Sequence, residues 1–222
     1  MTFSIEWDAQ YSRGSQLSTW PWSDLVSYIY RYAHPNDGFE KILELGCGAG
    51  ANIRLFKELG CDYWGIEGSP VIVASLHSQY PDLTDRIIVA DFTQDIPIDE
   101  FFDCVVDRSS LTHNSTADIS SALRMIYAKL RTGGKFIGID WFSTDHRDSH
   151  YGTVIDAYTK NNIKEGQFKA VGRVHFSDYD HLIELLSVAG FRIERLEHKF
   201  LHALIPADND PKAWWNFVAV KP

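Results

Sequence analysis

Short apolar runs alternate with longer amphipathic stretches through the first two thirds of the chain, and this rhythm constrains the fold most. Each run has the length of one buried strand. The runs cover residues 39–45, 62–67, 85–91, 101–107 and 135–140. The intervening stretches with helical spacing and caps are residues 51–60, 69–80 and 116–130. Strands that alternate with helices predict an α/β fold, with a parallel sheet and right-handed crossovers.

The rhythm changes on both sides of this core. Residues 23–33 have helical spacing and precede the first strand. After Asp140 comes a long polar and aromatic insert, in which we expect one helix. Long connections inside compact domains are often lids or pockets, so we expect the insert to form an acceptor site. A helix over 177–190 and strands over 191–200 and 213–220 complete the pattern.

Size and composition predict one soluble domain. The chain has 222 residues, of which 45% are hydrophobic and 23% are charged. Within a single domain 1–222, we expect four segments. They are an N-terminal cover (1–38), a ligand-binding core (39–140), an acceptor-site insert (141–176) and a C-terminal helix with strands (177–222).

Charge and cysteine usage narrow the partners. The net charge of −9 disfavours nucleic acid, which basic surfaces bind. The three cysteines show neither pairing nor metal-ligand spacing, and no His, Asp or Glu set predicts a metal site. The sequence shows no signal-peptide pattern and no apolar run of membrane-spanning length, so we expect a cytoplasmic protein with no membrane partner. The oligomeric state stays open between monomer and homodimer.

Three glycines follow the first predicted strand in "ILELGCGAG". In an open parallel sheet, ligands bind beyond the carboxyl ends of the strands, and Gly46, Gly48 and Gly50 would let a ligand approach the backbone there. A nicotinamide dinucleotide needs G-x-G-x-x-G for its pyrophosphate. This spacing differs, and Glu44 would face a pyrophosphate with like charge. A ligand with an ammonium group would instead benefit from Glu44.

The stretch closely resembles the first motif of class I S-adenosylmethionine-dependent methyltransferases. "VADFTQ", "FDCVVDRSSLTH" and "LRTGGKFIGID" are similar to later motifs of that family, in the right order. The resemblance is strong over residues 40–140 and continues more loosely through "VHFSDYDHLIELLSVAGF", as in small-molecule members. It implies a three-layer α/β/α sandwich, with a Rossmann-like, mostly parallel seven-stranded sheet whose last strand is antiparallel. It also implies S-adenosylmethionine as cofactor and S-adenosylhomocysteine as product.

The same resemblance implies roles for individual residues. Glu67 would accept both ribose hydroxyls, Asp91 would meet the adenine amino group, and Phe92 would lie against the adenine ring. Tyr11 or Arg13 would meet the cofactor carboxylate. The full set expected at the cofactor is Tyr11, Arg13, Glu44, Gly46, Cys47, Gly48, Gly50, Glu67, Gly68, Ser69, Asp91, Phe92 and Asp107.

Catalytic groups are less well marked. His113 follows the fourth strand in a loop that borders the methyl group in the family, so it is the first choice for a general base; a solvated loop histidine is the alternative. Asp107 and Asp140 end two strands and would orient an acceptor or a base. Several aromatic residues and histidines could either line the pocket or serve as packing or surface groups. These are Trp20, Trp22, Trp141, Phe142, Tyr151, His146, His150 and His175.

The sequence thus predicts methyl transfer to a small molecule, for which a hydroxyl of a sugar or related metabolite is one candidate. "DRSS" lacks the Asn/Asp-Pro-Pro-Tyr/Phe motif of N-methyltransferases that act on DNA bases or glutamine. Two alternatives stay open: an NAD(P)-dependent oxidoreductase, and a non-catalytic S-adenosylmethionine-binding protein. An RNA acceptor is disfavoured by the acidic balance.

Overall fold

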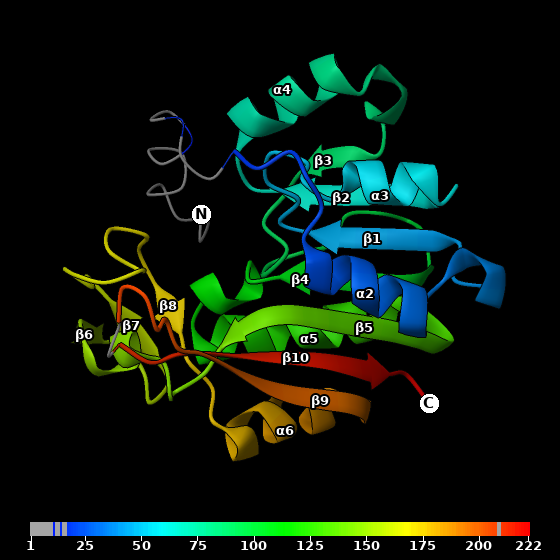
Figure 1. Ribbon diagram of the computed structural model, residues 1–222. Coiled ribbons are helices and arrows are strands. Elements are labelled where there is room, and N and C mark those ends of the chain that lie inside the picture. Colours follow the sequence, from blue (N-terminus) through cyan, green and yellow to red (C-terminus); the bar gives the residue numbers. More distant parts are fainter. Residues whose placement is uncertain (1–10, 12–13, 15–16, 208–209) are drawn as a thin grey trace.

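The computed structural model describes residues 11, 14, 17–207 and 210–222, and its centre is a seven-stranded sheet (Figure 1). The strand order is β3-β2-β1-β4-β5-β10-β9. The bounds are β1 Lys41–Leu45, β2 Asp62–Glu67, β3 Ile87–Val89, β4 Phe102–Arg108, β5 Leu130–Phe142, β9 Arg192–Leu201 and β10 Lys212–Val220. The first five strands pair in parallel, and β10 pairs antiparallel with both β5 and β9. The expected sheet and its antiparallel last strand are confirmed.

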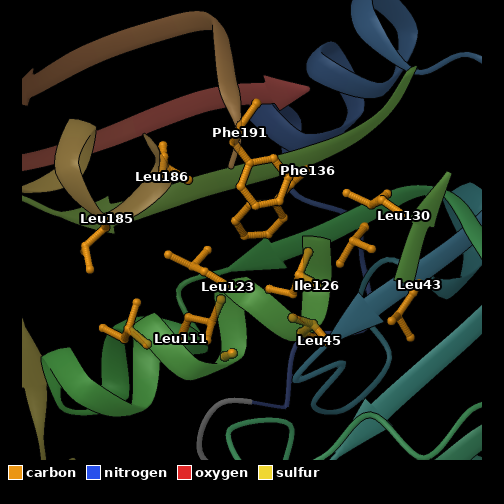
Figure 2. Close-up of a cluster of buried hydrophobic side chains, with 14 of the residues drawn as sticks. Leu43, Leu45, Leu111, Leu123, Ile126, Leu130, Phe136, Leu185, Leu186 and Phe191 are labelled. Atoms are coloured by element: carbon orange, nitrogen blue, oxygen red, sulfur yellow. The ribbon is translucent and has the colours of Figure 1, made fainter. Parts of the chain in front are cut away.

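Helices cover both faces of this sheet, which gives the expected three layers. On one face lie α2 (Ser23–Tyr32), α3 (Ile53–Glu58) and α4 (Pro70–Gln79). On the other lie α5 (Thr116–Lys129) and α6 (Tyr179–Val188), whose apolar side chains meet those of the strands (Figure 2).

The strands divide their side chains between these faces with a period of two. Ile42 of β1 belongs to the α2–α4 cluster, whereas Leu43 and Leu45 belong to the α5–α6 cluster. Successive side chains of a strand point to opposite faces, so an uninterrupted apolar run is required when both faces are covered. This is why the central strands read as apolar runs without alternation.

Parallel register brings the ends of neighbouring strands together. Leu45 of β1 pairs with Ile66 of β2 and with Asp107 of β4. The loops that follow these strands therefore begin at one edge of the sheet. Any ligand site made from those loops must lie at that edge.

The insert differs from the prediction. The expected helix is wrong: apart from one 3-10 turn (η4, Arg147–His150), its regular structure is a three-stranded sheet of β6 (Thr153–Val154), β7 (Thr159–Asn161) and β8 (Val174–His175). Asp156 explains the turn, because its Oδ1 accepts hydrogen bonds from the backbone N–H groups of Tyr158 and Thr159 at 2.9 and 2.8 Å. Such side-chain bonds compete with a helix.

The insert has an apolar cluster of its own. Its buried members are Phe142, Ile163, Phe168, Val171, Val174 and Phe176. The insert is thus packed as a compact unit beside the carboxyl end of β5 (Figure 1). No helix in the described ranges is both long and apolar enough to cross a membrane.

Candidate functional site

A cavity of about 1050 Å³, which includes space open to solvent, lies at the carboxyl ends of β1 to β4. Ten of the residues expected at the site line it: Tyr11, Glu44, Gly46, Cys47, Gly48, Glu67, Gly68, Asp91, Phe92 and His113. Trp22, an aromatic residue that the sequence suggests for the pocket wall, also lines the cavity. Sequence reasoning missed Ser18, Ala49, Ala51, Asn52, Ala90, Arg108, Ser109, Ser110 and Asn114.

The three glycines have positive φ angles of 59°, 51° and 81°, but they serve different purposes. A Cβ at Gly46 would lie 2.4 Å from the Cβ of Ser110, so this glycine lets the β1 and β4 loops pack together. A Cβ at Gly50 would meet Leu76 of α4 at 2.8 Å, and Gly50 does not line the cavity. At Gly48 the nearest atom would be the Tyr11 hydroxyl at 3.5 Å. Gly48 is therefore the glycine beside which the protein leaves room for a ligand.

Glu44 is a buried carboxylate at the cavity wall, with 3% of its surface exposed. Asn52 Nδ2 and the Tyr63 hydroxyl each donate a hydrogen bond to it at 2.7 Å. Both partners are neutral, so burial raises the pKa of Glu44 to about 7 despite these bonds. A cationic group in the cavity would favour the charged carboxylate, which fits a ligand that carries an ammonium group.

Glu67 shapes the neighbouring part of the cavity from the end of β2. Its Oε2 accepts a hydrogen bond from Gly48 N–H at 2.9 Å, and its Oε1 accepts one from Ser69 N–H at 3.0 Å. These bonds fix the carboxylate against the glycine loop. The carboxylate is thereby held at the cavity wall, at the end of β2.

Asp91 and Phe92 extend the wall beyond β3. Asp91 Oδ1 accepts hydrogen bonds from the backbone N–H and the hydroxyl of Thr93, at 3.0 and 2.6 Å. The Phe92 ring approaches the position that a Cβ at Gly46 would take, to 3.7 Å. An acceptor carboxylate beside an aromatic ring suits a flat heterocycle with an amino group.

His113 lines the cavity from the turn η3 (Leu111–His113) after β4. Its Nδ1 lies 3.0 Å from the backbone oxygen of Arg173, and its ring meets Phe142 edge-on at 5.6 Å. Because a carbonyl oxygen can only accept, Nδ1 carries the proton in the neutral ring and Nε2 has the lone pair. Burial lowers the pKa of His113 to about 4, so the ring is neutral at pH 7.

Asp107 differs from the expected role, because it is fully buried and does not line the cavity. Its Oδ1 accepts hydrogen bonds from Ser110 and from Leu111 N–H (3.0 Å), and its Oδ2 accepts one from Trp141 Nε1 at 2.7 Å. Burial raises the pKa of Asp107 to about 6. This carboxylate holds the turn that carries His113, and it contacts neither ligand space nor solvent.

Asp140 does not line the cavity either; it anchors a residue that does. Its Oδ2 accepts hydrogen bonds from Arg108 Nε at 3.1 Å and pairs with Nη2 at 3.0 Å. The Arg108 guanidinium lies 3.6 Å from the ring centre of Trp22. Arg108 and Trp22 together form the cavity wall beyond β4. The position of Arg108, one residue past the strand-end Asp107, was the signal that sequence reasoning could have used.

Another expected cofactor residue, Ser69, does not line the cavity. Ser69 is buried behind the wall and caps α4, where its Oγ accepts from Ile72 N–H at 3.4 Å. Arg13 lies outside the described residues. Cys47 does line the cavity, and burial raises the pKa of its thiol well above the usual value. The three cysteines are free thiols.

The insert does not supply the cavity wall that the sequence predicted. Among the described residues, none from 141–176 lines the cavity. Trp141 and Phe142 are core residues, Tyr151 packs beside the insert cluster, and Trp20 is exposed. Of the histidines, His146 and His175 are buried and His150 is exposed. The insert instead contacts a residue that lines the cavity, because Phe142 and the Arg173 carbonyl hold the ring of His113.

The part of the chain that the structure describes holds no group of three or more His, Cys, Asp or Glu side chains arranged to bind a metal ion. The cavity instead offers buried carboxylates, open glycine backbone, an aromatic ring and a neutral imidazole. That donor set suits an organic ligand with a cationic end, hydroxyl groups and a flat ring.

Comparison with known proteins points to an organic ligand of this kind. A family model described as a methyltransferase domain matches residues 19–196. No protein of curated function matches the sequence.

Several solved structures share the fold. A SAM-dependent methyltransferase from Methanosarcina mazei superposes with a TM-score of 0.67 at 16% identity, over 91% of this chain and 98% of its own. An S-adenosylmethionine-dependent methyltransferase from Mesorhizobium loti gives 0.64 at 18% identity, over 98% of each chain. The Burkholderia thailandensis 1,6-didemethyltoxoflavin-N1-methyltransferase, solved with bound 1,6-didemethyltoxoflavin and S-adenosylhomocysteine, gives a TM-score of 0.67 at 18% identity, over 98% of this chain and 86% of its own.

Proposed function

Since this chain belongs to the class I S-adenosylmethionine-dependent methyltransferases, we propose that it methylates a hydroxyl group of a small molecule, a sugar or related metabolite, held at the β4 end of the cavity. S-adenosylmethionine is the cofactor and S-adenosylhomocysteine the product. The match to this family leaves nothing in favour of the dinucleotide-dependent alternative. A small-molecule acceptor is supported by the Burkholderia neighbour, which acts on one.

The order of strands along the cavity supports the placement of the cofactor. Asp91 and Phe92 after β3 would take the adenine, Glu67 at the end of β2 the ribose, and Glu44 in β1 the amino group. Gly48 would leave room for the ligand along the backbone. This assignment uses the walls from β3, β2 and β1, so the acceptor falls to the wall from β4.

His113 carries the proposal for the chemistry. A bound cofactor would supply an electrophilic methyl group, which the acceptor oxygen would take as the sulfur leaves. His113 would take the hydroxyl proton at Nε2, the nitrogen left basic by the Nδ1 contact with Arg173. Asp107 would act by holding the η3 turn, and the insert by excluding water behind the ring.

The test is His113→Asn, with turnover measured as S-adenosylhomocysteine release over a panel of sugars, hydroxy acids, phenols and amines. We expect a loss of roughly 10²–10⁴-fold in turnover, the usual contribution of a general base. Affinity for S-adenosylhomocysteine should stay within about twofold, because His113 lies beyond the wall assigned to the cofactor.

His150→Asn is the matched control, because His150 is exposed and lies outside the cavity. Equal turnover in the two variants would remove His113 as the base. Acceptors modified only at nitrogen would overturn the choice of a hydroxyl. Binding of S-adenosylhomocysteine without turnover on any acceptor class would contradict the proposed reaction.

A further inference from the structure

Arg108 is the one cation among the described residues that line the cavity. The other charged lining residues are Glu44, Glu67 and Asp91, which the proposed function gives to the cofactor. Arg108 lies at the end of β4, and its anchor Asp140 belongs to β5, one strand further from β1. Its position is therefore on the acceptor side of the cavity.

The fold holds this guanidinium from two directions. Asp140 Oδ2 engages Nε and Nη2 at 3.1 and 3.0 Å, and the Trp22 ring covers one face at 3.6 Å. The side chain is 28% exposed. Burial lowers the pKa of Arg108, but a guanidinium stays protonated in proteins.

The anchor itself adopts an uncommon backbone conformation. Asp140 has φ 55°, and Ser109 beside it has φ 59°. Asn216 Oδ1 accepts a hydrogen bond from Asp140 N–H at 2.8 Å, and Ser109 Oγ donates one to the Asp140 carbonyl at 2.9 Å. Left-handed residues other than glycine persist where the surroundings fix them, and they cluster at ligand sites. Here they aim the Asp140 carboxylate at Arg108.

Part of the guanidinium is not used by these contacts. Within the described residues, no hydrogen-bond acceptor lies on Nη1, and Asp140 occupies only the edge formed by Nε and Nη2. A guanidinium whose orientation is fixed by one carboxylate and one ring presents its remaining donors in a defined direction. Planar oxyanions such as carboxylate, and phosphate, match the guanidinium fork best.

We propose that the acceptor carries an anionic oxygen group, a carboxylate or a phosphate, which Arg108 binds through Nη1 while Trp22 flanks it. This makes Arg108 the residue that selects the acceptor, and Asp140 the positioning residue behind it. The inference rests on the proposed function, because it takes the β1 to β3 walls as the place of the cofactor. The rival assignment, Arg108 on the cofactor carboxylate, predicts a different result in the same experiment.

The experiment measures ligand binding to the protein saturated with S-adenosylhomocysteine. The probes are benzoate and inorganic phosphate, with benzamide as the uncharged match for benzoate, and binding is followed by calorimetry. Arg108→Met is compared with Arg54→Met, which removes an arginine that stacks on the exposed Trp20 at 4.9 Å outside the cavity. Arg108→Lys keeps the positive charge but removes the planar set of guanidinium donors. It replaces Arg108→Met in the comparison if the methionine variant folds poorly.

We expect wild type and Arg54→Met to bind benzoate or phosphate alike. Arg108→Met should bind that anion at least about tenfold more weakly, and the affinity of Arg108→Lys should lie between those of wild type and Arg108→Met. The affinity for benzamide should be the same in all variants. Affinity for S-adenosylhomocysteine should stay within about twofold in every variant.

Two results on anion binding would overturn the proposal: unchanged anion binding in Arg108→Met, or no anion binding by the wild-type complex. A tenfold loss of S-adenosylhomocysteine affinity in Arg108→Met would also overturn it, because Arg108 would then be assigned to the cofactor. Failure of wild-type protein to bind S-adenosylhomocysteine would instead overturn the proposed function itself.

Discussion

The two halves of the cavity are built in different ways. The half along β1, β2 and β3 uses residues within or just after each strand, such as Gly48, Glu67 and Asp91. The hydrogen bonds that Ser69 donates to Glu67 and Thr93 donates to Asp91 join residues two apart in the chain. The half along β4 depends on distant partners: Arg108 is fixed by Asp140 and Trp22. A locally determined half can be recognised in a sequence. In the half along β4, a substitution in any of the distant segments that hold Arg108 could change which acceptor is bound.

The largest effects should separate the two glycines of the first half. Gly46→Ala forces a Cβ to within 2.4 Å of Ser110 at positive φ, whereas Gly48→Ala meets only the Tyr11 hydroxyl at 3.5 Å. We expect Gly46→Ala to lower the free energy of unfolding by about 2–5 kcal/mol and Gly48→Ala by about 1–2 kcal/mol. Urea denaturation measures both, and equal losses would contradict the different roles.

The larger Gly48→Val substitution tests the cavity itself. Its side chain would occupy ligand space beside Tyr11, so binding of S-adenosylhomocysteine should be abolished in a protein that still folds. Isothermal calorimetry measures the affinity, and circular dichroism checks the fold. Wild-type affinity in this variant would remove the glycine loop from the cofactor site.

Glu67→Ala should weaken the binding of S-adenosylhomocysteine by about 1–3 kcal/mol, the cost of removing hydrogen bonds to a charged acceptor. Part of the effect will come from the loop, because Glu67 also accepts from Gly48 N–H. Glu58→Ala, on the exposed surface of α3, is the control and should change the affinity less than about twofold. If both variants bind alike, Glu67 does not meet the ribose.

We expect cofactor affinity to depend on pH through Glu44. Burial raises its pKa to about 7, above the usual 4.5. The free protein therefore loses stability as pH rises from 4.5 to 7, because the unfolded carboxylate ionises in this range while the buried one keeps its proton. A ligand ammonium group favours the ionised form, so binding below pH 7 must release a proton. Affinity for S-adenosylhomocysteine should therefore rise by up to about tenfold per unit between pH 5 and 7 and level off above.

Glu44→Gln is the matched variant for this titration. It keeps the shape and removes the ionisation, so its affinity should be lower at pH 8 and nearly flat with pH. Calorimetry in two buffers of different ionisation enthalpy counts the released protons. An identical pH slope in wild type and variant would assign the proton release to another group.

The smallest effect is expected in the second half. Trp22→Leu removes the stack on Arg108, which should cost about 0.5–2 kcal/mol of stability, and should leave S-adenosylhomocysteine affinity within about twofold. Trp20→Leu is the control, since Trp20 is 68% exposed and its arginine partner lies at 4.9 Å. A strong loss of cofactor affinity in Trp22→Leu would show that the two halves are not separate.

The strand ends show how far the sequence could be taken. Glu67, Asp107 and Asp140 all end predicted strands, and all were expected at the site. The structure places Glu67 in the cavity wall and Asp107 behind it, where Trp141 and the η3 turn take its oxygens. Asp140 is turned to Arg108 by its left-handed backbone. A carboxylate at a strand end is visible in a sequence, but its hydrogen-bond partners are not.

The sequence by itself determined the order of strands and helices, the doubly covered sheet and the glycine loop with Glu44 and Glu67. These can be recognised because hydrophobic periodicity, caps and the short glycine motif are patterns of neighbouring residues. Only the tertiary structure decided that the insert packs as a separate small sheet, that His113 is a neutral buried ring, and that Trp22, Arg108 and Asp140 form one wall. Those features depend on contacts between distant segments, whose partners no local pattern specifies.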